Sequence, residues 1–93
     1  MSHPVPIRQV LSQILRQYAE NPATVVPRIR HILEEAEWAR HLHYCHIQYF
    51  KDTVVIRTQS PAVRHDLQYH THHIRTLLQE MMPGIPIRRV VVR

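Results

Sequence analysis

Histidine and cysteine are the residues of this chain whose chemistry is most readily named. One group comprises His41, His43, Cys45 and His46, and a second comprises His70, His72 and His73. Zinc requires about four nitrogen or sulfur ligands in a tetrahedral arrangement. A strand through the first group places only His43 and Cys45 on the same side, and the spacing matches no zinc signature. The sequence therefore predicts no metal site and no cofactor.

Nucleophilic catalysis by Cys45 has little support in the sequence. A reactive thiolate needs a facing base, and the neighbouring histidines lie too near in sequence to guarantee that geometry. A buried strand cysteine is the default interpretation. Gly84 is the only glycine, so no glycine-rich phosphate loop can be built. We therefore predict that the protein is not an enzyme.

Arginine dominates the charge of the chain. Twelve Lys and Arg stand against seven Asp and Glu, for a formal net charge of +5, and Lys51 is the single lysine. Residues 1–50 carry five Arg and four Glu, whereas residues 51–93 carry seven cations and three carboxylates. This excess in the second half favours a polyanionic partner. Protonation of the nine histidines would strengthen such binding at low pH.

The cations of the second half fall on different predicted elements. Arg64 and Arg75 end a polar stripe, with Gln68 and Thr71 between them, on one side of a predicted helix. The candidate phosphate contacts are Lys51, Arg57, Arg64, Arg75, Arg88 and Arg89, and Arg93 adds to the basic character of the last strand. The candidate stacking platforms are Tyr44, Tyr49, Phe50 and Tyr69. A solvated helix face and aromatic residues packed in the core are the structural alternatives.

Helical periodicity places three helices along the chain. Apolar residues at helical spacing predict the first over residues 7–20, with Asn21-Pro22 as its stop. The second is predicted from Pro27 to about Ala39. Ser60-Pro61 is an N-cap and first-turn pair that opens the third, which Pro83-Gly84 ends. His70 falls in its apolar arc, so we expect a structural histidine bonded to a backbone carbonyl.

Alternation and β-branching place three strands. Residues 43–50 have a period of two, with Cys45, Ile47 and Tyr49 on one side, and residues 53–58 are almost all β-branched. Lys51-Asp52 joins the two strands as a hairpin turn. Residues 85–93 are predicted to form the last strand. The predicted order is helix, helix, strand, strand, helix, strand, an α+β fold with a three-stranded sheet packed by helices.

Length and composition suit one domain. Ninety-three residues allow a single module over residues 1–93. The lone Cys45 excludes an internal disulfide and favours a reducing, cytoplasmic location. No run approaches the ~18 apolar residues of a membrane span, so we expect no membrane partner.

The stretch from His43 to Arg93 resembles the DciA-like family of bacterial replicative-helicase loaders. Four segments carry the resemblance: Asp52 to Ile56, Ser60-Pro61-Ala62-Val63, Leu67-Gln68-Tyr69, and Ile87 to Val92. Val63 stands where the family usually has Trp, and Gln68 stands where it often has Arg. The resemblance implies a KH-like domain, although the GxxG loop of KH domains is absent.

This resemblance implies a role in DNA replication without chemistry of its own. The domain would dock on the hexameric DnaB-type replicative helicase and help to place it on single-stranded DNA. Glu34, Glu35 and Glu37 are the candidate helicase contacts, with a solvated helix face as the alternative. Two other functions remain open: a KH-like RNA-binding or ribosome-associated protein, and a protein-binding adaptor without nucleic acid.

Overall fold

The computed structural model describes residues 21–93, so the helix predicted over residues 7–20 lies outside the described part of the chain. The elements are α2 (Pro22–Glu34), the 3-10 helix η1 (Ala39–Tyr44), β1 (Cys45–Phe50), β2 (Thr53–Thr58), α3 (Pro61–Tyr69), α4 (Thr71–Met81) and β3 (Arg89–Val92). The predicted α+β class and the order of elements are confirmed. Within residues 21–93, no helix combines the length and apolar character that crossing a bilayer requires.

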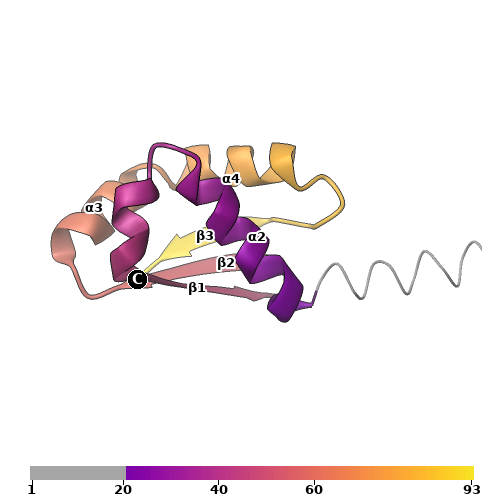
Figure 1. The fold of residues 1–93 in the computed structure, drawn as a ribbon, viewed down its shortest axis with the longest axis horizontal. Helices are drawn as coiled ribbons and strands as arrows, with labels where there is room; N and C mark the ends of the chain where they lie inside the picture. The colour runs from indigo at the N-terminus through magenta and orange to yellow at the C-terminus, as the bar shows by residue number, and fades with distance from the viewer. Residues whose placement is uncertain (1–20) are drawn as a thin grey trace, which may run out of the picture.

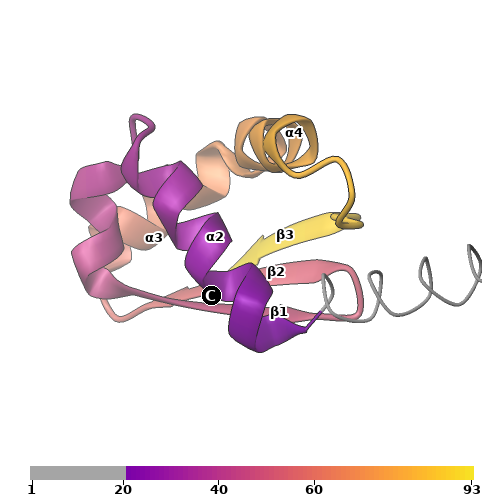
Figure 2. The same ribbon diagram turned by 45° about the vertical axis from the view of Figure 1, so that its right-hand side comes forward.

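The sheet has the strand order β1-β2-β3, with β1 and β2 antiparallel and β2 and β3 parallel. Parallel neighbours need a crossover, which α3 and α4 supply. The helices pack on one face of the sheet, and α2 runs past β1 so that its first turn reaches the sheet edge (Figures 1 and 2). Among residues 21–93, no helix covers the opposite face (Figure 1).

One hydrophobic core joins the helices to the covered face of the sheet. Ile29 of α2, Ile56 of β2 and Leu78 of α4 are fully buried within it. Trp38, which precedes η1, is also buried at 3% exposure, and its ring meets the rings of His70 and His73 edge-on. Trp38 thus anchors the turn after α2 against the α3–α4 junction.

The α2 boundaries differ from the predicted range of Pro27 to about Ala39. Asn21 is the N-cap of α2, because its side chain accepts a hydrogen bond from the Ala23 amide at 3.0 Å and Pro22 occupies the first turn. Pro27 lies inside the helix, and the helix ends at Glu34. The predicted start at Pro27 was therefore wrong by about one turn, because Asn21-Pro22 already supplies the N-cap and the first-turn proline.

The predicted long helix is two helices, divided at His70. The His70 backbone has φ −108° and ψ 14°, its amide donates to the Leu67 carbonyl, and its carbonyl accepts from the Ile74 amide. His70 therefore ends α3 and begins α4. Its Nδ1 lies 2.8 Å from the Asp66 carbonyl oxygen, which confirms the expected bond to a backbone carbonyl.

The hairpin turn follows the prediction, and the last strand is shorter than predicted. Lys51 and Asp52 both adopt left-handed backbone angles, φ 47° and 64°, as a two-residue hairpin turn requires. The last strand begins at Arg89 rather than at residue 85. Ile85 and Ile87 are buried ahead of it, so this stretch serves the core instead of the strand ladder.

Candidate nucleic-acid interface

The uncovered face of the sheet presents three rows of side chains, each row crossing all three strands. Strand alternation and the register define them. The rows are His46, Arg57 and Arg93; Gln48, Val55 and Val91; and Phe50, Thr53 and Arg89. Arg93 completes the first row because its amide donates to the Ile56 carbonyl at 2.9 Å and its carbonyl accepts from the Thr58 amide at 3.0 Å. We call these nine residues the open face.

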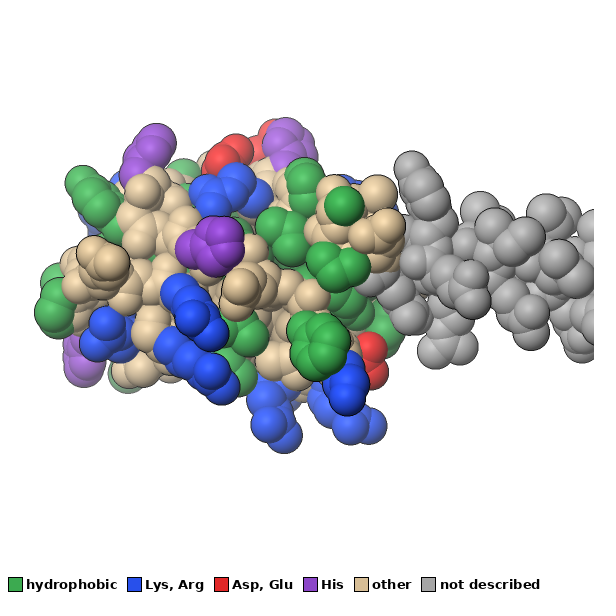
Figure 3. Space-filling model, turned by 90° about the horizontal axis from the view of Figure 1, so that it is seen from below, with side chains coloured by type: hydrophobic (Ala, Val, Ile, Leu, Met, Phe, Trp, Pro, Cys, Tyr) green, Lys and Arg blue, Asp and Glu red, His purple; other side chains and the backbone are tan. Residues whose placement is uncertain are grey.

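Cations occupy both ends of the open face. Arg57 and Arg93 lie in the row at one end, Arg89 lies in the row at the other end, and Lys51 lies at the adjacent turn; all four are exposed. Two residues along a strand span about 6.6 Å, so the outer rows are about 13 Å apart. The middle row, Gln48, Val55 and Val91, carries no charge. Figure 3 shows Lys and Arg side chains gathered on this face.

These cations are not neutralised by carboxylates. Within residues 21–93, every contact between an acidic and a basic side chain involves a histidine, and none involves Lys51 or an arginine. No Asp or Glu lines either of the two hollows that flank the open face. Acidic side chains in Figure 3 lie at the margins of this view. The surface potential over the open face is therefore positive.

An exposed aromatic ring lies beside one positive end. Phe50 is 67% exposed, and the Lys51 ammonium lies 5.3 Å from its ring centroid. A hollow of about 1030 Å³ extends from this end toward α2, and Pro22 and Val26 form its other wall. An exposed ring next to unpaired cations is the pairing of groups that a base and its phosphate require.

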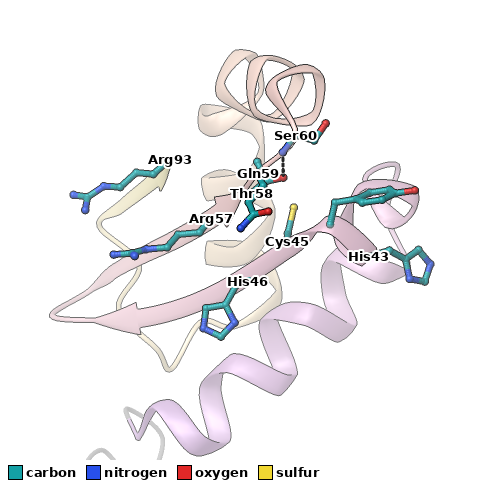
Figure 4. A pocket seen from close by; sticks show the side chains of 9 residues that line it. His43, Cys45, His46, Arg57, Thr58, Gln59, Ser60 and Arg93 are labelled. Atoms are coloured by element: carbon teal, nitrogen blue, oxygen red, sulfur yellow. Dashed lines mark hydrogen bonds between the residues drawn. The ribbon is translucent and has the colours of Figure 1, made fainter.

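The second hollow, of about 800 Å³, lies where β1 begins and β2 ends. The residues that line it include His46, Arg57 and Arg93 of the open face together with Tyr44, Gln59 and Ser60. Figure 4 shows the Arg57 and Arg93 side chains extending in the same direction from neighbouring strands. Arg93 lines both hollows, so the two hollows meet on the open face.

Arg64 and Arg75, two of the predicted phosphate contacts, lie on the helices instead of the open face. A terminal nitrogen of Arg64 donates to the Thr58 carbonyl at 2.9 Å, and its Nε is buried. Arg75 donates to Nδ1 of His72 at 2.9 Å. Arg75 also lines a small hollow of about 130 Å³ together with Arg89. Arg75 therefore lies near the open face, beside Arg89. Arg64 instead bonds to the backbone at the end of β2.

The remaining candidates divide between the open face and its surroundings. Arg57 and Arg89 lie on the open face, and Lys51 lies at the adjacent turn. Arg88 is exposed but precedes β3 and lines neither large hollow. Its amide, like that of Arg89, donates to the Asp52 carbonyl, so its backbone holds the hairpin turn against β3.

Two glutamine side chains, Gln68 of the polar stripe and Gln79 one turn beyond it, have a structural role. The Gln68 side-chain amide donates to the Val92 carbonyl at 3.1 Å, and the Gln79 amide donates to the Ile87 carbonyl at 2.7 Å. Both carbonyls belong to the segment that forms the outer edge of the sheet. These amides satisfy edge groups that would otherwise be available for pairing with another strand.

Arg93 and His46 are site residues that the candidate set missed. From the sequence, Arg93 was considered only as part of the charge of the last strand. Alternation from Arg89 nevertheless places residues 89, 91 and 93 on one face of that strand. His46 was read as a metal candidate. Its position opposite Arg57 follows from the hairpin register, which the two-residue turn at residues 51–52 already fixes.

The four candidate stacking residues have different surroundings. Tyr49 is 5% exposed and its hydroxyl donates to the Pro86 carbonyl at 2.7 Å, so it is a core residue. Phe50 lies on the open face. Tyr44 is 66% exposed and lines the second hollow, and Tyr69 is 82% exposed on α3. Two of the four, Phe50 and Tyr44, therefore border the cations.

Cys45 is poorly suited to nucleophilic chemistry. Its Sγ donates to the His41 carbonyl at 3.2 Å. Burial raises the pKa of the Cys45 thiol, and a hydrogen bond with Thr58 and the charge of Arg30 offset this only in part. The thiol is therefore protonated at neutral pH, and an activated thiolate is not formed.

Four of the histidines in residues 21–93, His31, His41, His70 and His73, contact carboxylates. Nε2 of His41 lies 2.6 Å from Oδ2 of Asp66, and His73 lies 3.6 Å from Glu37. Among residues 21–93, no three His, Cys, Asp or Glu side chains are placed to share a metal ion.

The acidic candidates lie outside the two hollows of the open face. Glu34 and Glu35 are at the end of α2, and Glu37 lies in the turn that follows. All three are exposed. Glu35 contacts His31 at 3.3 Å and Glu37 contacts His73, which leaves Glu34 as the acidic side chain of this patch without such a contact in the described chain.

Comparison with known proteins does not identify a relative: no family model, curated protein or solved structure matches this chain.

Proposed function

We propose that the open face binds single-stranded nucleic acid. The observation that carries the proposal is that Lys51, Arg57, Arg89 and Arg93 share one surface with the exposed ring of Phe50, and that no carboxylate lines the hollows of this surface. Phosphates would contact the cations of the outer rows, and a base would stack on Phe50. Duplex DNA offers phosphates but no free base face, so the single strand is the better ligand.

In the cell, we propose that the protein is a non-enzymatic, cytoplasmic DNA replication factor with a KH-like domain. It would bind the DnaB-type replicative helicase and single-stranded DNA and so assist helicase loading. The support is the resemblance of residues 43–93 to the DciA-like loaders together with the cationic open face. The acidic patch at the end of α2 lies outside both hollows, so a helicase bound there would leave the open face accessible.

Fluorescence anisotropy with labelled single-stranded DNA, duplex DNA and structured RNA of equal length tests the first proposal. We expect the single strand to bind most tightly, and Phe50→Ala to reduce that preference over the duplex. Tighter binding of structured RNA would favour an RNA-associated function. Absence of binding to any nucleic acid at about 50 mM salt would overturn the proposal.

Size-exclusion chromatography with a purified replicative helicase tests the second proposal. We expect co-elution that survives high salt and that is weakened by Glu34→Lys. Co-elution with the helicase but no binding to nucleic acid would identify a protein-binding adaptor. Failure to co-elute in the presence and absence of an oligonucleotide would contradict the loader assignment.

A further inference from the structure

The lining of the second hollow includes groups that phosphate binding does not explain. Arg57 and Arg93 suit a phosphate, but Tyr44 and Gln59 add an aromatic ring and an amide to the same hollow. Its volume of about 800 Å³ lies within the range of small-molecule sites, about 300–1,000 Å³. A ligand that fills it must therefore offer more than charge.

The polar groups that Tyr44, Gln59 and Ser60 contribute to the hollow differ in whether they already form hydrogen bonds. The Ser60 Oγ accepts from the Val63 amide at 3.3 Å, and the Ser60 amide donates to Thr58 Oγ1 at 3.2 Å. Within residues 21–93, neither the Gln59 amide nor the Tyr44 hydroxyl forms a hydrogen bond. Tyr44 is 66% exposed and Gln59 is exposed. Tyr44 and Gln59 are thus the groups available to a ligand.

We propose that this hollow binds one nucleobase of the strand held on the open face. The inference rests on the proposed single-strand binding and adds a base site to it. A phosphate between Arg57 and Arg93 brings its attached nucleoside to the mouth of the hollow. There Tyr44 stacks on the base, and Gln59 pairs a donor and an acceptor with the base edge.

The base site makes particular nucleotide positions of the bound strand differ from the others, which a uniform cationic face would not do. Phe50 and the hollow lie at opposite ends of the open face, and the outer rows are about 13 Å apart. A stacked strand advances about 3.4 Å per nucleotide, so about four nucleotides span the distance between the two outer rows. Removal of a single base from a bound strand should therefore weaken binding at the two positions that contact an aromatic ring, and not at the positions between them.

Anisotropy measurements with a single abasic site moved along an oligonucleotide of about eight residues test the proposal. We expect two positions at which loss of the base weakens binding about tenfold, because stacking of one base contributes on that order. Tyr44→Ala should weaken binding of the intact strand similarly and abolish the abasic effect at one position only. Tyr69→Ala is the matched control, since Tyr69 is exposed on α3 outside the hollow.

Cys45 provides a second readout because it lines the hollow and is the only cysteine of the chain. We expect a bound oligonucleotide to slow alkylation of Cys45 by N-ethylmaleimide. Inorganic polyphosphate of equal charge should protect it less, because polyphosphate has no base to enter the hollow.

The outcomes separate this inference from the proposed function. If no oligonucleotide binds, the proposed function fails and the base site fails with it. If oligonucleotides bind but Tyr44→Ala behaves like Tyr69→Ala, the open face binds strands and the base site is wrong. Equal protection of Cys45 by polyphosphate would likewise overturn the base site.

Discussion

Removal of Arg93 offers the sharpest test of the open face. Arg93 was not among the cations chosen from the sequence, yet it lines both hollows and lies beside Arg57 in the same row. Its side chain is exposed. Arg93→Ala should therefore alter nucleic-acid binding without disturbing the core.

The size of the effect follows from the number of cations on the face. Each phosphate neutralised on a single strand contributes about 0.7 to the slope of log affinity against log salt. If the four cations of the open face and its turn each meet one phosphate, the slope is about −2.8, and affinity falls about 50-fold between about 50 and 200 mM salt. Arg93→Ala should reduce the slope to about −2.1 and the fall to about 20-fold.

The assay is a salt titration of binding to labelled single-stranded DNA, followed by fluorescence anisotropy. Arg28→Ala is the matched control, because it removes the same charge from an exposed position on α2. Arg28 lines a hollow between α2 and α4, together with Ile32 and Met81, and not the open face. The control should keep the wild-type slope.

Two results would refute the reasoning. Parallel salt dependence for the wild type and Arg93→Ala would show that Arg93 meets no phosphate. A slope that falls equally in Arg93→Ala and Arg28→Ala would show that binding responds to net charge and not to the open face.

Three further predictions concern stability and the thiol. Asp66→Asn should lower the free energy of unfolding by about 1 kcal/mol in urea titrations, because the half-exposed Asp66 carboxylate bonds to His41. Asp52→Gly should raise it by about 0.5 kcal/mol, because glycine adopts the left-handed backbone of Asp52 without strain; an unchanged midpoint would contradict this. The raised pKa of Cys45 means that the unfolded chain loses the thiol proton first, so stability should decline above about pH 8.5 in the wild type and not in Cys45→Ser.

Much of the secondary structure is readable from local sequence. The hairpin of residues 45–58 follows from alternation, β-branched residues and a two-residue turn, all of which act between neighbours. The start of α3 follows from Ser60-Pro61, where Ser60 caps the helix as its type predicts. The start of α2 was predicted at Pro27 instead of Pro22, because both Pro22 and Pro27 are compatible with the first turn of a helix. The break at His70 was not foreseen because helical periodicity continues across it.

The residues of the candidate site could be predicted from the sequence only in part. Arg57 and Arg89 could be placed on strands, and Lys51 at the turn, but the helical arginines could not be separated from them by charge alone. Arg64 bonds to the Thr58 carbonyl because α3 folds back over the end of β2. That contact depends on the packing of α3, so the sequence pattern of α3 does not reveal it.

The sequence by itself determined which side chains alternate on each strand, where the hairpin turns and how much positive charge the second half carries, because these properties arise within a few residues. Only the tertiary structure decided that Arg57 and Arg93 are neighbours. Their adjacency requires β3 to pair in parallel with β2 after the chain has passed through two helices. Such a pairing is selected by burial of the common core, a property of the whole fold that local patterns do not encode.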